Sequence, residues 1–304
     1  LAEECRHWGG TVRLGQRAVA CRSEGEGMVT RLRGADGGLC QVRSRWVVDA
    51  TGERRCLLGD QEIAASADPL VEGLGVEWLL RLPLAAAARW QDQLSFCLGS
   101  DWVPQGYGWV FPMQPGVLKV GICRLRDPQR PQPPLAPLLE RLIERLFDPL
   151  ERRQLEVPDR HGGRIRSRVR RKEPHRLGQL LGLGDVVSTA NLLGGEGIRH
   201  ALASARVMGP LLQQALRSDQ GHRPDPLVAY PRRLRRALGW RWSLSGRLAR
   251  RTWLGLRDEH ADRRLERLLD GLQECRAEDL SALLFDYRFE RYGLRSLPYL
   301  LGWR

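Results

Sequence analysis

The most informative stretch of the sequence is GLGDVVSTANLLGGEGI, residues 182–198. The apolar run 180–183 leads into it and predicts a buried strand. After the glycine cluster, apolar residues recur at helical spacing from Ile198 to Ala215, which predicts an amphipathic helix that Pro210 should kink. The stretch therefore predicts a strand, a glycine-rich loop and a helix in succession.

Several residues of this stretch suit a bound molecule. Asp185 stands at the end of the predicted strand, where its carboxylate can accept hydrogen bonds from a polyol. Gly194, Gly195 and Gly197 let the backbone approach a planar ring, and the helix that follows directs its positive end at such a ring. The alternative is a plain strand–loop–helix connection whose glycines serve tight turns, and the spacing alone leaves both interpretations open.

A second pattern, PQGYGWVFP at residues 104–112, predicts a strand with an aromatic face. Alternation places Tyr107, Trp109 and Phe111 on one side of it. Such a face can line an apolar slot in which the Tyr hydroxyl and the Trp N–H are the polar groups. An ordinary aromatic core face is the other interpretation.

A third pattern is the small-residue turn Ala50-Thr51-Gly52, which follows the apolar segment 46–48 and Asp49. A turn of this kind at the end of a buried strand lets a cofactor's phosphate or ribose approach the backbone. The pattern is common by itself, and it gains meaning only from the other two.

The remaining strands and helices are expected from local patterns. Pro-Gly within 113–116 predicts a hairpin turn, the Pro-rich segment 127–137 predicts a linker, and helical spacing over 138–147 predicts a helix. Short strands are expected at 11–14, 29–32, 40–42, 75–82, 94–98, 106–112 and 117–123.

The composition is strongly basic, with a formal net charge of +13 and a sequence pI of about 10.3. Nearly all of this charge is arginine, since Lys119 and Lys172 are the only lysines. No nucleic-acid-binding module is visible, the arginines are interleaved with acids, and a GC-rich coding sequence would give the same bias. We therefore expect no nucleic-acid partner.

Cysteine and histidine patterns argue against a metal site or a disulfide framework. The seven cysteines are odd in number and have no CxxC spacing, and the six histidines form no HExxH motif. Reduced thiols in a cytoplasmic protein fit this pattern. No apolar run reaches 18 residues, so no transmembrane helix is expected.

Together these patterns resemble the geranylgeranyl reductase family of FAD-dependent oxidoreductases, relatives of the flavin-dependent hydroxylases. The segment from Val48 to Gly52 resembles the family's ATG or ADG motif, and 104–112 matches its PxxYxWxFP signature at every fixed position. Gly184-Asp185 and the GEGI sequence at 195–198 resemble its flavin-binding loop. The resemblance covers roughly residues 1–216.

The resemblance implies FAD as the cofactor and NAD(P)H or ferredoxin as the electron donor. It implies hydride transfer from reduced flavin to a double bond of a prenyl-type small molecule or lipid, without identifying the catalytic proton donor or an oligomeric state. It assigns substrate contact to Tyr107, Trp109 and Phe111. It assigns cofactor contact to Ala50, Thr51, Gly52, Gly184, Asp185, Gly194, Gly195, Gly197 and Ile198.

The sequence departs from the family pattern at several positions. Val186-Val187-Ser188 stands where two alanines and a glycine are usual, Leu192 replaces a proline, and Thr51 stands where hydroxylases carry an Asp. No GxGxxG occurs in the chain, and Leu1 falls inside a predicted helix. We therefore expect that the βαβ unit that holds the FAD pyrophosphate lies upstream, or else that this chain does not bind FAD tightly by itself. A flavin-dependent monooxygenase or halogenase-like enzyme and a non-catalytic flavin-binding remnant are the alternatives.

The expected fold is α/β (α+β). Residues 1–64 and 175–225 should form a partial FAD-binding Rossmann-like domain without its N-terminal βαβ unit. Residues 65–174 should form a mostly antiparallel sheet that binds substrate, and 226–304 a helical region.

A basic, Trp-containing segment at 232–251 suggests peripheral membrane contact. The alternative is a solvated helix whose Leu/Trp face packs on the flavin domain.

Overall fold

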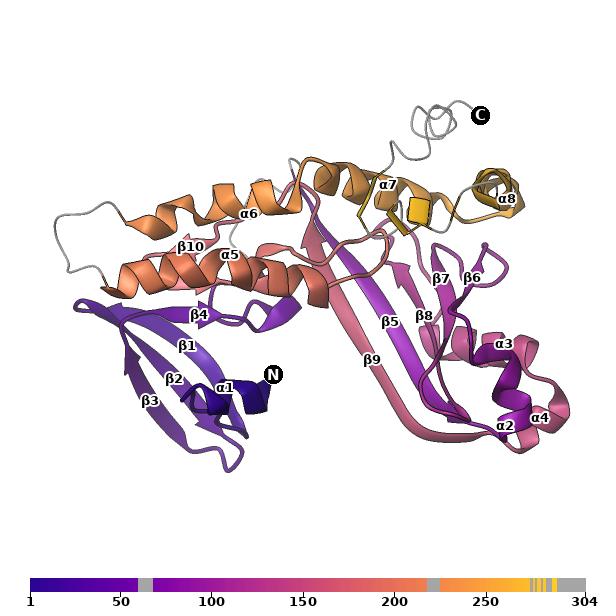
Figure 1. Cartoon of the computed structure of the whole chain (residues 1–304), viewed down its shortest axis with the longest axis horizontal. Helices are drawn as coiled ribbons and strands as arrows, with labels where there is room; N and C mark the ends of the chain where they lie inside the picture. The colour runs from indigo at the N-terminus through magenta and orange to yellow at the C-terminus, as the bar shows by residue number, and fades with distance from the viewer. Residues whose placement is uncertain are drawn as a thin grey trace.

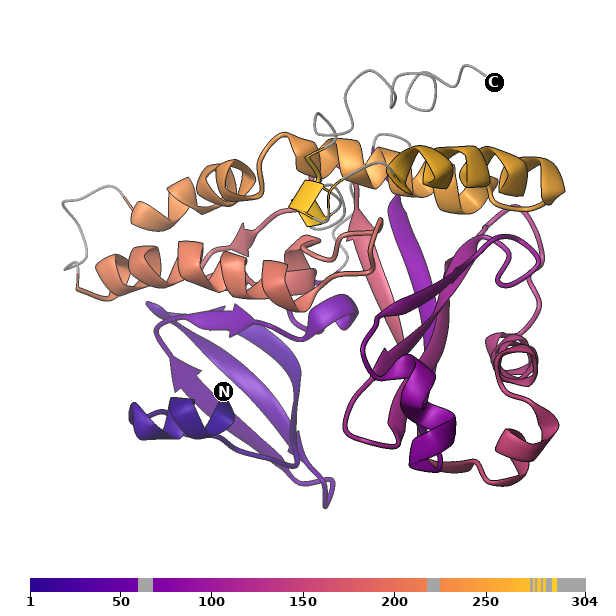
Figure 2. The same ribbon diagram turned by 45° about the vertical axis from the view of Figure 1, so that its right-hand side comes forward.

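The computed structural model describes residues 1–59, 68–217 and 225–273, together with 276, 278–279, 281–282 and 286–288. Two separate sheet regions lie below a layer formed by the long helices in the views of Figures 1 and 2. The chain is a mixed α/β structure with largely antiparallel sheets and C-terminal helices, as expected. Among the described residues, no helix has the length and apolar character needed to cross a membrane.

The N-terminal sheet is an antiparallel meander in the order β1-β2-β3, preceded by the short helix α1. The strand expected at 11–14 is wrong: these residues are mostly exposed, and Gly15 has a φ of 70° just before β1 begins. The strands expected at 29–32 and 40–42 lie inside β2 and β3. The bounds are α1 Ala2–His7, β1 Gln16–Glu24, β2 Gly27–Gly34 and β3 Leu39–Ser44.

A small sheet in the order β10-β11-β4 contains a parallel pair, β4 and β11. Both strands pack beneath the long helix α5, and Tyr230 and Leu234 of α6 join the same apolar core. The expected strand at 180–183 and the helix beginning at Ile198 are therefore confirmed. The bounds are β4 Val47–Asp49, β10 Arg176–Leu177, β11 Leu180–Gly182, α5 Ile198–Arg217 and α6 Tyr230–Leu238.

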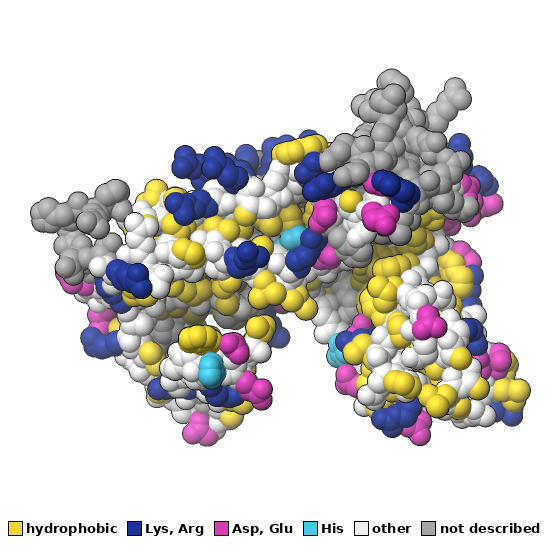
Figure 3. Space-filling model, in the orientation of Figure 1, with side chains coloured by type: hydrophobic (Ala, Val, Ile, Leu, Met, Phe, Trp, Pro, Cys, Tyr) yellow, Lys and Arg dark blue, Asp and Glu magenta, His cyan; other side chains and the backbone are white. Residues whose placement is uncertain are grey.

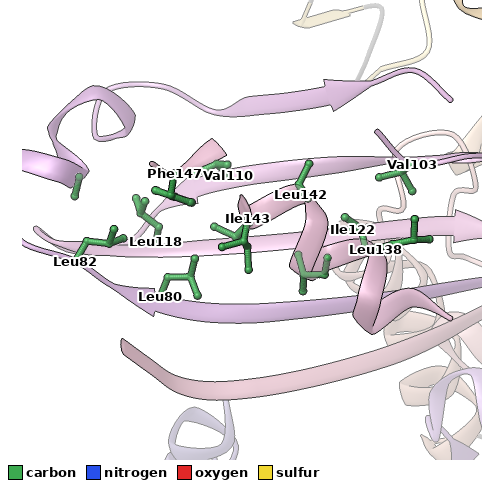
Figure 4. Packing of buried hydrophobic residues seen from close by; sticks show 13 residues of the cluster. Leu80, Leu82, Val103, Val110, Leu118, Ile122, Leu138, Leu142, Ile143 and Phe147 are labelled. Atoms are coloured by element: carbon green, nitrogen blue, oxygen red, sulfur yellow. The ribbon is translucent and has the colours of Figure 1, made fainter. Parts of the chain in front are cut away.

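A five-stranded antiparallel sheet has the order β6-β7-β8-β5-β9. One face packs on α3, where Leu80, Val110 and Leu118 from the strands meet Leu142 from the helix (Figure 4). The strand expected at 106–112 matches β7. The bounds are β5 Leu70–Arg81, β6 Ser95–Leu98, β7 Gly106–Pro112, β8 Val117–Leu125, β9 Glu156–Arg168 and α3 Leu135–Leu146.

The longest strand, β9, was not expected from the sequence. Its residues, EVPDRHGGRIRSR, are mostly polar and exposed because β9 is the edge of the sheet. The helix α3 also begins inside the expected linker, at Leu135. Short connecting helices complete this region: α2 Leu84–Ala87, η2 Ala88–Trp90 and α4 Pro149–Arg153.

The C-terminal helices lie over the ends of the strands (Figures 1 and 2). Ala249 of α7 packs against Val71, Leu125 and Leu192, which ties the helix to the five-stranded sheet and to the glycine-rich loop. The bounds are η4 Pro226–Ala229, α7 Arg241–Gly255 and α8 Glu259–Gln273. Residues 289–304 of the expected helical region lie outside the described residues.

Candidate functional site

The parallel pair of strands brings two of the predicted motifs to one edge of the small sheet. Asp49 pairs with Gly182, and the Leu183 N–H donates to the Asp49 carbonyl at 2.9 Å. Because parallel strands end on the same side, the turn at 50–52 lies beside Gly184. The 3₁₀ turns that follow, η1 (Gly52–Arg54) and η3 (Gly184–Val187), are in contact.

Asp49 is the residue that shapes the first turn. Its buried carboxylate accepts hydrogen bonds from the Thr51 N–H at 3.0 Å and the Thr51 hydroxyl at 2.6 Å. It also accepts from the backbone of Leu57 at 2.9 Å and Leu58 at 2.8 Å. The Thr51 hydroxyl in turn accepts from the Cys56 N–H at 2.8 Å. The Thr51 hydroxyl is therefore committed to the turn, and the polar groups that Ala50 to Gly52 offer to a ligand are those of the backbone.

Asp185 lies beside the start of α5. A Cβ added to Gly197 would sit 3.5 Å from Asp185 Oδ2, and the Thr189 hydroxyl donates to Oδ1 at 3.2 Å. Burial raises the pKa of Asp185, against the lowering effects of Thr189 and Arg55. The half-buried carboxylate thus faces the positive end of a 20-residue helix.

Gly184 has a packing function. Its N–H donates to Ser204 Oγ at 3.0 Å, and an added Cβ would lie 3.2 Å from Ala201 Cβ. The missing side chain allows α5 to approach the strand end closely.

The departure Val186-Val187-Ser188 is accommodated by the fold. Ser188 has a φ of 57°, a conformation that glycine adopts at lower cost. Its buried Oγ accepts from Arg55 Nη2 at 2.8 Å and from the Arg168 N–H at 2.9 Å, which offsets that cost. Both valines are fully buried in the core beneath α5.

The glycine-rich loop is held by two hydrogen bonds to its backbone. The Asn191 N–H donates to the Glu196 carbonyl at 2.7 Å, and the Tyr107 hydroxyl donates to the Gly194 carbonyl at 2.9 Å. Gly194 and Gly195 are exposed, as is Ile198, whose exposed fraction is 82%. The loop backbone is thus accessible to a ligand although its position is fixed.

Glu196 anchors the first turn of α5. Its carboxylate accepts from Arg199 at 2.8 Å and from the Tyr287 hydroxyl at 2.8 Å, and lies 3.3 Å from His200 Nε2. Burial opposes ionisation, but hydrogen bonds from His200, Arg199 and Tyr287 outweigh it and lower the pKa of Glu196 to about 2. Tyr287 comes from the C-terminal region, whose involvement in the loop the sequence did not indicate.

The three aromatic residues of β7 share one face of the strand, as predicted. The ring centroids of Tyr107 and Trp109 are 5.9 Å apart, and those of Trp109 and Phe111 are 6.0 Å apart. The Trp109 ring lies over Gly121, where an added Cβ would overlap it. Phe111 also contacts Phe96, at 5.4 Å between centroids.

A cavity of about 290 Å³ opens on this aromatic face, near the lower end of the ~300–1,000 Å³ range for ligand pockets. Tyr107 and Trp109 line it together with Gly195 of the loop and Trp253 of α7. Phe111 is not among its lining residues. Glycines from β5 and β9 also line it, namely Gly73, Gly75, Gly162 and Gly163.

A polar group that the sequence did not indicate forms one wall of this cavity. His161 on β9 pairs directly with Glu77 on β5, and their side chains meet at 3.0 Å. His161 Nδ1 also contacts Asp159 at 2.8 Å, and Trp109 Nε1 donates to Glu77 at 2.9 Å. Only the β5–β9 register brings these residues together, and β9 carries no local strand signal.

Comparison of the sequence finds no matching family model and no matching curated protein. Comparison of the structure finds clear similarities. A geranylgeranyl bacteriochlorophyll reductase-like protein from Thermoplasma acidophilum aligns over 94% of this chain and 70% of its own, with a TM-score of 0.70 and 21% identity. The p-nitrophenol 4-monooxygenase of Pseudomonas putida DLL-E4 aligns over 96% and 71%, with a TM-score of 0.65 and 17% identity.

Aklavinone-11 hydroxylase, solved with FAD and aklavinone, aligns over 85% of this chain and 47% of its own, with a TM-score of 0.58 and 18% identity. These similarities show the fold. The chain has the flavin hydroxylase-like architecture that the resemblance implied.

Proposed function

We propose that this chain forms the ring-facing part of an FAD-dependent oxidoreductase site. One observation carries the proposal: a single cavity is lined by Gly195 of the glycine-rich loop and by Tyr107 and Trp109 of the aromatic strand. Tyr107 and Gly194 are 87 residues apart in the sequence, yet they are hydrogen-bonded close to the start of α5. The flavin hydroxylase-like fold supports the same assignment.

The residues present suit a flavin on its ring and polyol side. Asp185 offers a half-buried carboxylate as acceptor for ribityl hydroxyls, and Gly194 and Gly195 present exposed backbone. The positive end of α5 favours an electron-rich ring edge at Gly197. On the dinucleotide side, the polar groups that the turn at 50–52 offers are those of its backbone, since the Thr51 hydroxyl is engaged internally.

For the reaction, we favour reduction of a prenyl double bond. A reduced flavin supplies a hydride when bound. The chain's own contribution is an apolar slot walled by Trp109 and Trp253, which suits an isoprenoid chain. The contact of His161 with Glu77 and Asp159 gives that slot one group able to deliver a proton.

Monooxygenation of an aromatic substrate is the second candidate. The similarity to a nitrophenol monooxygenase and to aklavinone-11 hydroxylase favours it, and the same aromatic wall can stack on a phenolic ring. Oxygen uptake coupled to NADPH oxidation would distinguish it from reduction of a prenyl alcohol under anaerobic conditions.

The flavin assignment is tested by titrating the chain with FAD and following flavin fluorescence. Asp185→Ala should weaken binding roughly tenfold to a hundredfold, because a hydrogen bond to a charged group contributes ~1.5–3 kcal/mol. Asp92→Ala removes an exposed carboxylate elsewhere and serves as the matched control. Equal affinity of the Asp185 variant and the control would remove Asp185 from the site.

A further inference from the structure

Residues 226–257 form a long basic segment. They contain nine arginines and no acidic residue. Residues 160–172 form a second basic run, but there Arg164 and Arg166 pair with Glu53 in the fold. The segment 226–257 forms η4, α6 and α7. All of its arginines except Arg257, which pairs with Asp127, lie on the two consecutive helices α6 and α7.

Both helices bury one face and expose the other. Leu234, Trp242 and Leu248 are buried in the protein, as the packing alternative for this segment predicted. Opposite them, exposed arginines project outward, and Figure 3 shows Lys and Arg side chains gathered over α6 along the upper edge of the molecule. The exposed arginines of the two helices are Arg232, Arg233, Arg235, Arg236, Arg247, Arg250 and Arg251.

The positive charge of three arginines on α6 is not neutralised by neighbouring carboxylates. In the described part of the chain, no carboxylate lies within ion-pairing distance of Arg232, Arg233 or Arg236. Clustered like charges repel one another, so the face gains from a partner that carries many negative charges.

An exposed tryptophan lies in the middle of the arginines. Trp240 follows Gly239 at the turn between α6 and α7, and 68% of it is exposed. The Arg241 guanidinium lies 5.1 Å from the centroid of its ring. The Trp240 indole is therefore flanked by cations and is not packed in the protein core. Such a side chain suits the boundary between lipid headgroups and acyl chains.

The same helix also reaches the candidate site from its other side. Trp253 of α7 lines the cavity and donates to the Leu193 carbonyl at 3.0 Å. A partner bound to the outer face of α7 would therefore be separated from the apolar slot by this one helix.

We propose that the outer face of α6 and α7, defined by the exposed arginines and Trp240, binds the surface of an anionic lipid bilayer. Phosphates of nucleic acid would satisfy the arginines equally well. However, binding to phosphates does not explain why the Trp240 indole is exposed at the turn. In the described part of the chain, the arginines are also not accompanied by an element that would read the bases in a groove. The proposal is independent of the flavin assignment, because vesicle binding requires neither cofactor nor substrate.

The test is co-sedimentation of the chain with phosphatidylcholine vesicles that contain or lack phosphatidylserine, at low and high salt. We expect binding only to the anionic vesicles, and loss of that binding at high salt. The triple variant Arg232→Gln, Arg233→Gln, Arg236→Gln should bind on the order of a hundredfold more weakly. Trp240→Ala should bind several-fold more weakly without a change in salt dependence.

The matched control removes three exposed arginines from the N-terminal region, Arg13→Gln, Arg31→Gln and Arg33→Gln. It has the same net charge as the triple variant and should retain wild-type binding, while circular dichroism confirms that all variants are folded. Absence of wild-type binding at low salt, or an equal loss in control and triple variant, overturns the proposal. Tighter binding of a DNA duplex or RNA hairpin than of anionic vesicles overturns it in favour of nucleic acid.

Discussion

The two faces of the five-stranded sheet differ sharply although the same strands build both. Toward α3, β8 presents Leu118, Val120 and Ile122, all fully buried. Toward the cavity it presents Lys119, Gly121 and Cys123 between them. Because side chains alternate along a strand, neighbouring residues serve different purposes. One face supplies the stability of the sheet, and the other is left open by glycines and bounded by aromatic and polar side chains.

The largest expected effect is on the α3 face. Leu118→Ala should lower the free energy of unfolding by about 2–5 kcal/mol, since it leaves a cavity in a closed core. Its neighbour Lys119 pairs with Glu77 at 3.2 Å on the partly exposed opposite face, so Lys119→Ala should cost less than about 1 kcal/mol. Urea denaturation of both variants checks the difference, and equal losses would contradict the division between the faces.

Two glycines on the cavity face of the sheet differ in whether a neighbouring side chain lies above them. A Cβ on Gly121 would overlap the Trp109 ring, whereas a Cβ on Gly163 would meet nothing within 4 Å. Gly121→Ala should therefore cost about 1–3 kcal/mol through overpacking, and Gly163→Ala should change stability by about 0.5 kcal/mol or less. Thermal unfolding compares the pair. A destabilised Gly163 variant would mean that the cavity is closed at that position.

A smaller effect is expected where the cavity face meets the glycine-rich loop. Tyr107→Phe removes the hydrogen bond to the Gly194 carbonyl and the weaker contact of the hydroxyl with the Cys123 thiol, and should cost about 0.5–1.5 kcal/mol. Tyr230→Phe removes a comparable bond to the Gly182 carbonyl, which lies 3.1 Å away in the other core. Hydrogen exchange should speed up around 193–197 in the Tyr107 variant only. The same change in both variants would show that Tyr107 does not hold the loop.

The smallest effect concerns thiol chemistry. Burial raises the pKa of Cys123 to about 12, although hydrogen bonds with Tyr107 oppose the shift. The thiol is thus protonated at neutral and mildly alkaline pH and becomes a thiolate only as the pH rises toward 12. Exposed Cys5, Cys40 and Cys56 should react with iodoacetamide at pH 8 while Cys123 does not, as peptide mass spectrometry can measure. Rapid labelling of Cys123 would indicate an open, hydrated cavity.

The comparison also explains what the sequence could predict. Strand β7 and the start of α5 were predicted because their signals are local: aromatic alternation at 104–112 and helical spacing after Gly197. Strand β9 was missed because its outward residues are charged and its pairing with β5 is set by contacts far along the chain. The prediction of a strand at 11–14 was wrong although its sequence pattern is typical of a strand, because its apolar residues pack against no core.

The residues of the candidate site also fall into those that local motifs predicted and those that they did not. Tyr107, Trp109 and Gly195 were predicted from motifs, and the structure places them around one cavity. Glu77 and His161 lie 84 residues apart, and nothing near either position indicates that they meet. The cofactor contact expected of Thr51 stays a prediction, and the structure adds that its hydroxyl is engaged by Asp49 and Cys56. Local motifs reveal which backbone segments are special, but side-chain partners depend on the register of distant strands.

The ring-and-polyol part of a flavin site that we assign to this chain can be tested by comparing the binding of three flavins. Riboflavin, FMN and FAD share the ring and the ribityl chain, which Gly195 and Asp185 should contact, whereas the 304 residues contain no GxGxxG for a pyrophosphate. Titration followed by flavin fluorescence should therefore give dissociation constants within roughly tenfold of one another, each raised by Asp185→Ala. Failure of all three flavins to bind, or a strong preference for FAD that Asp185→Ala leaves unchanged, would contradict the account.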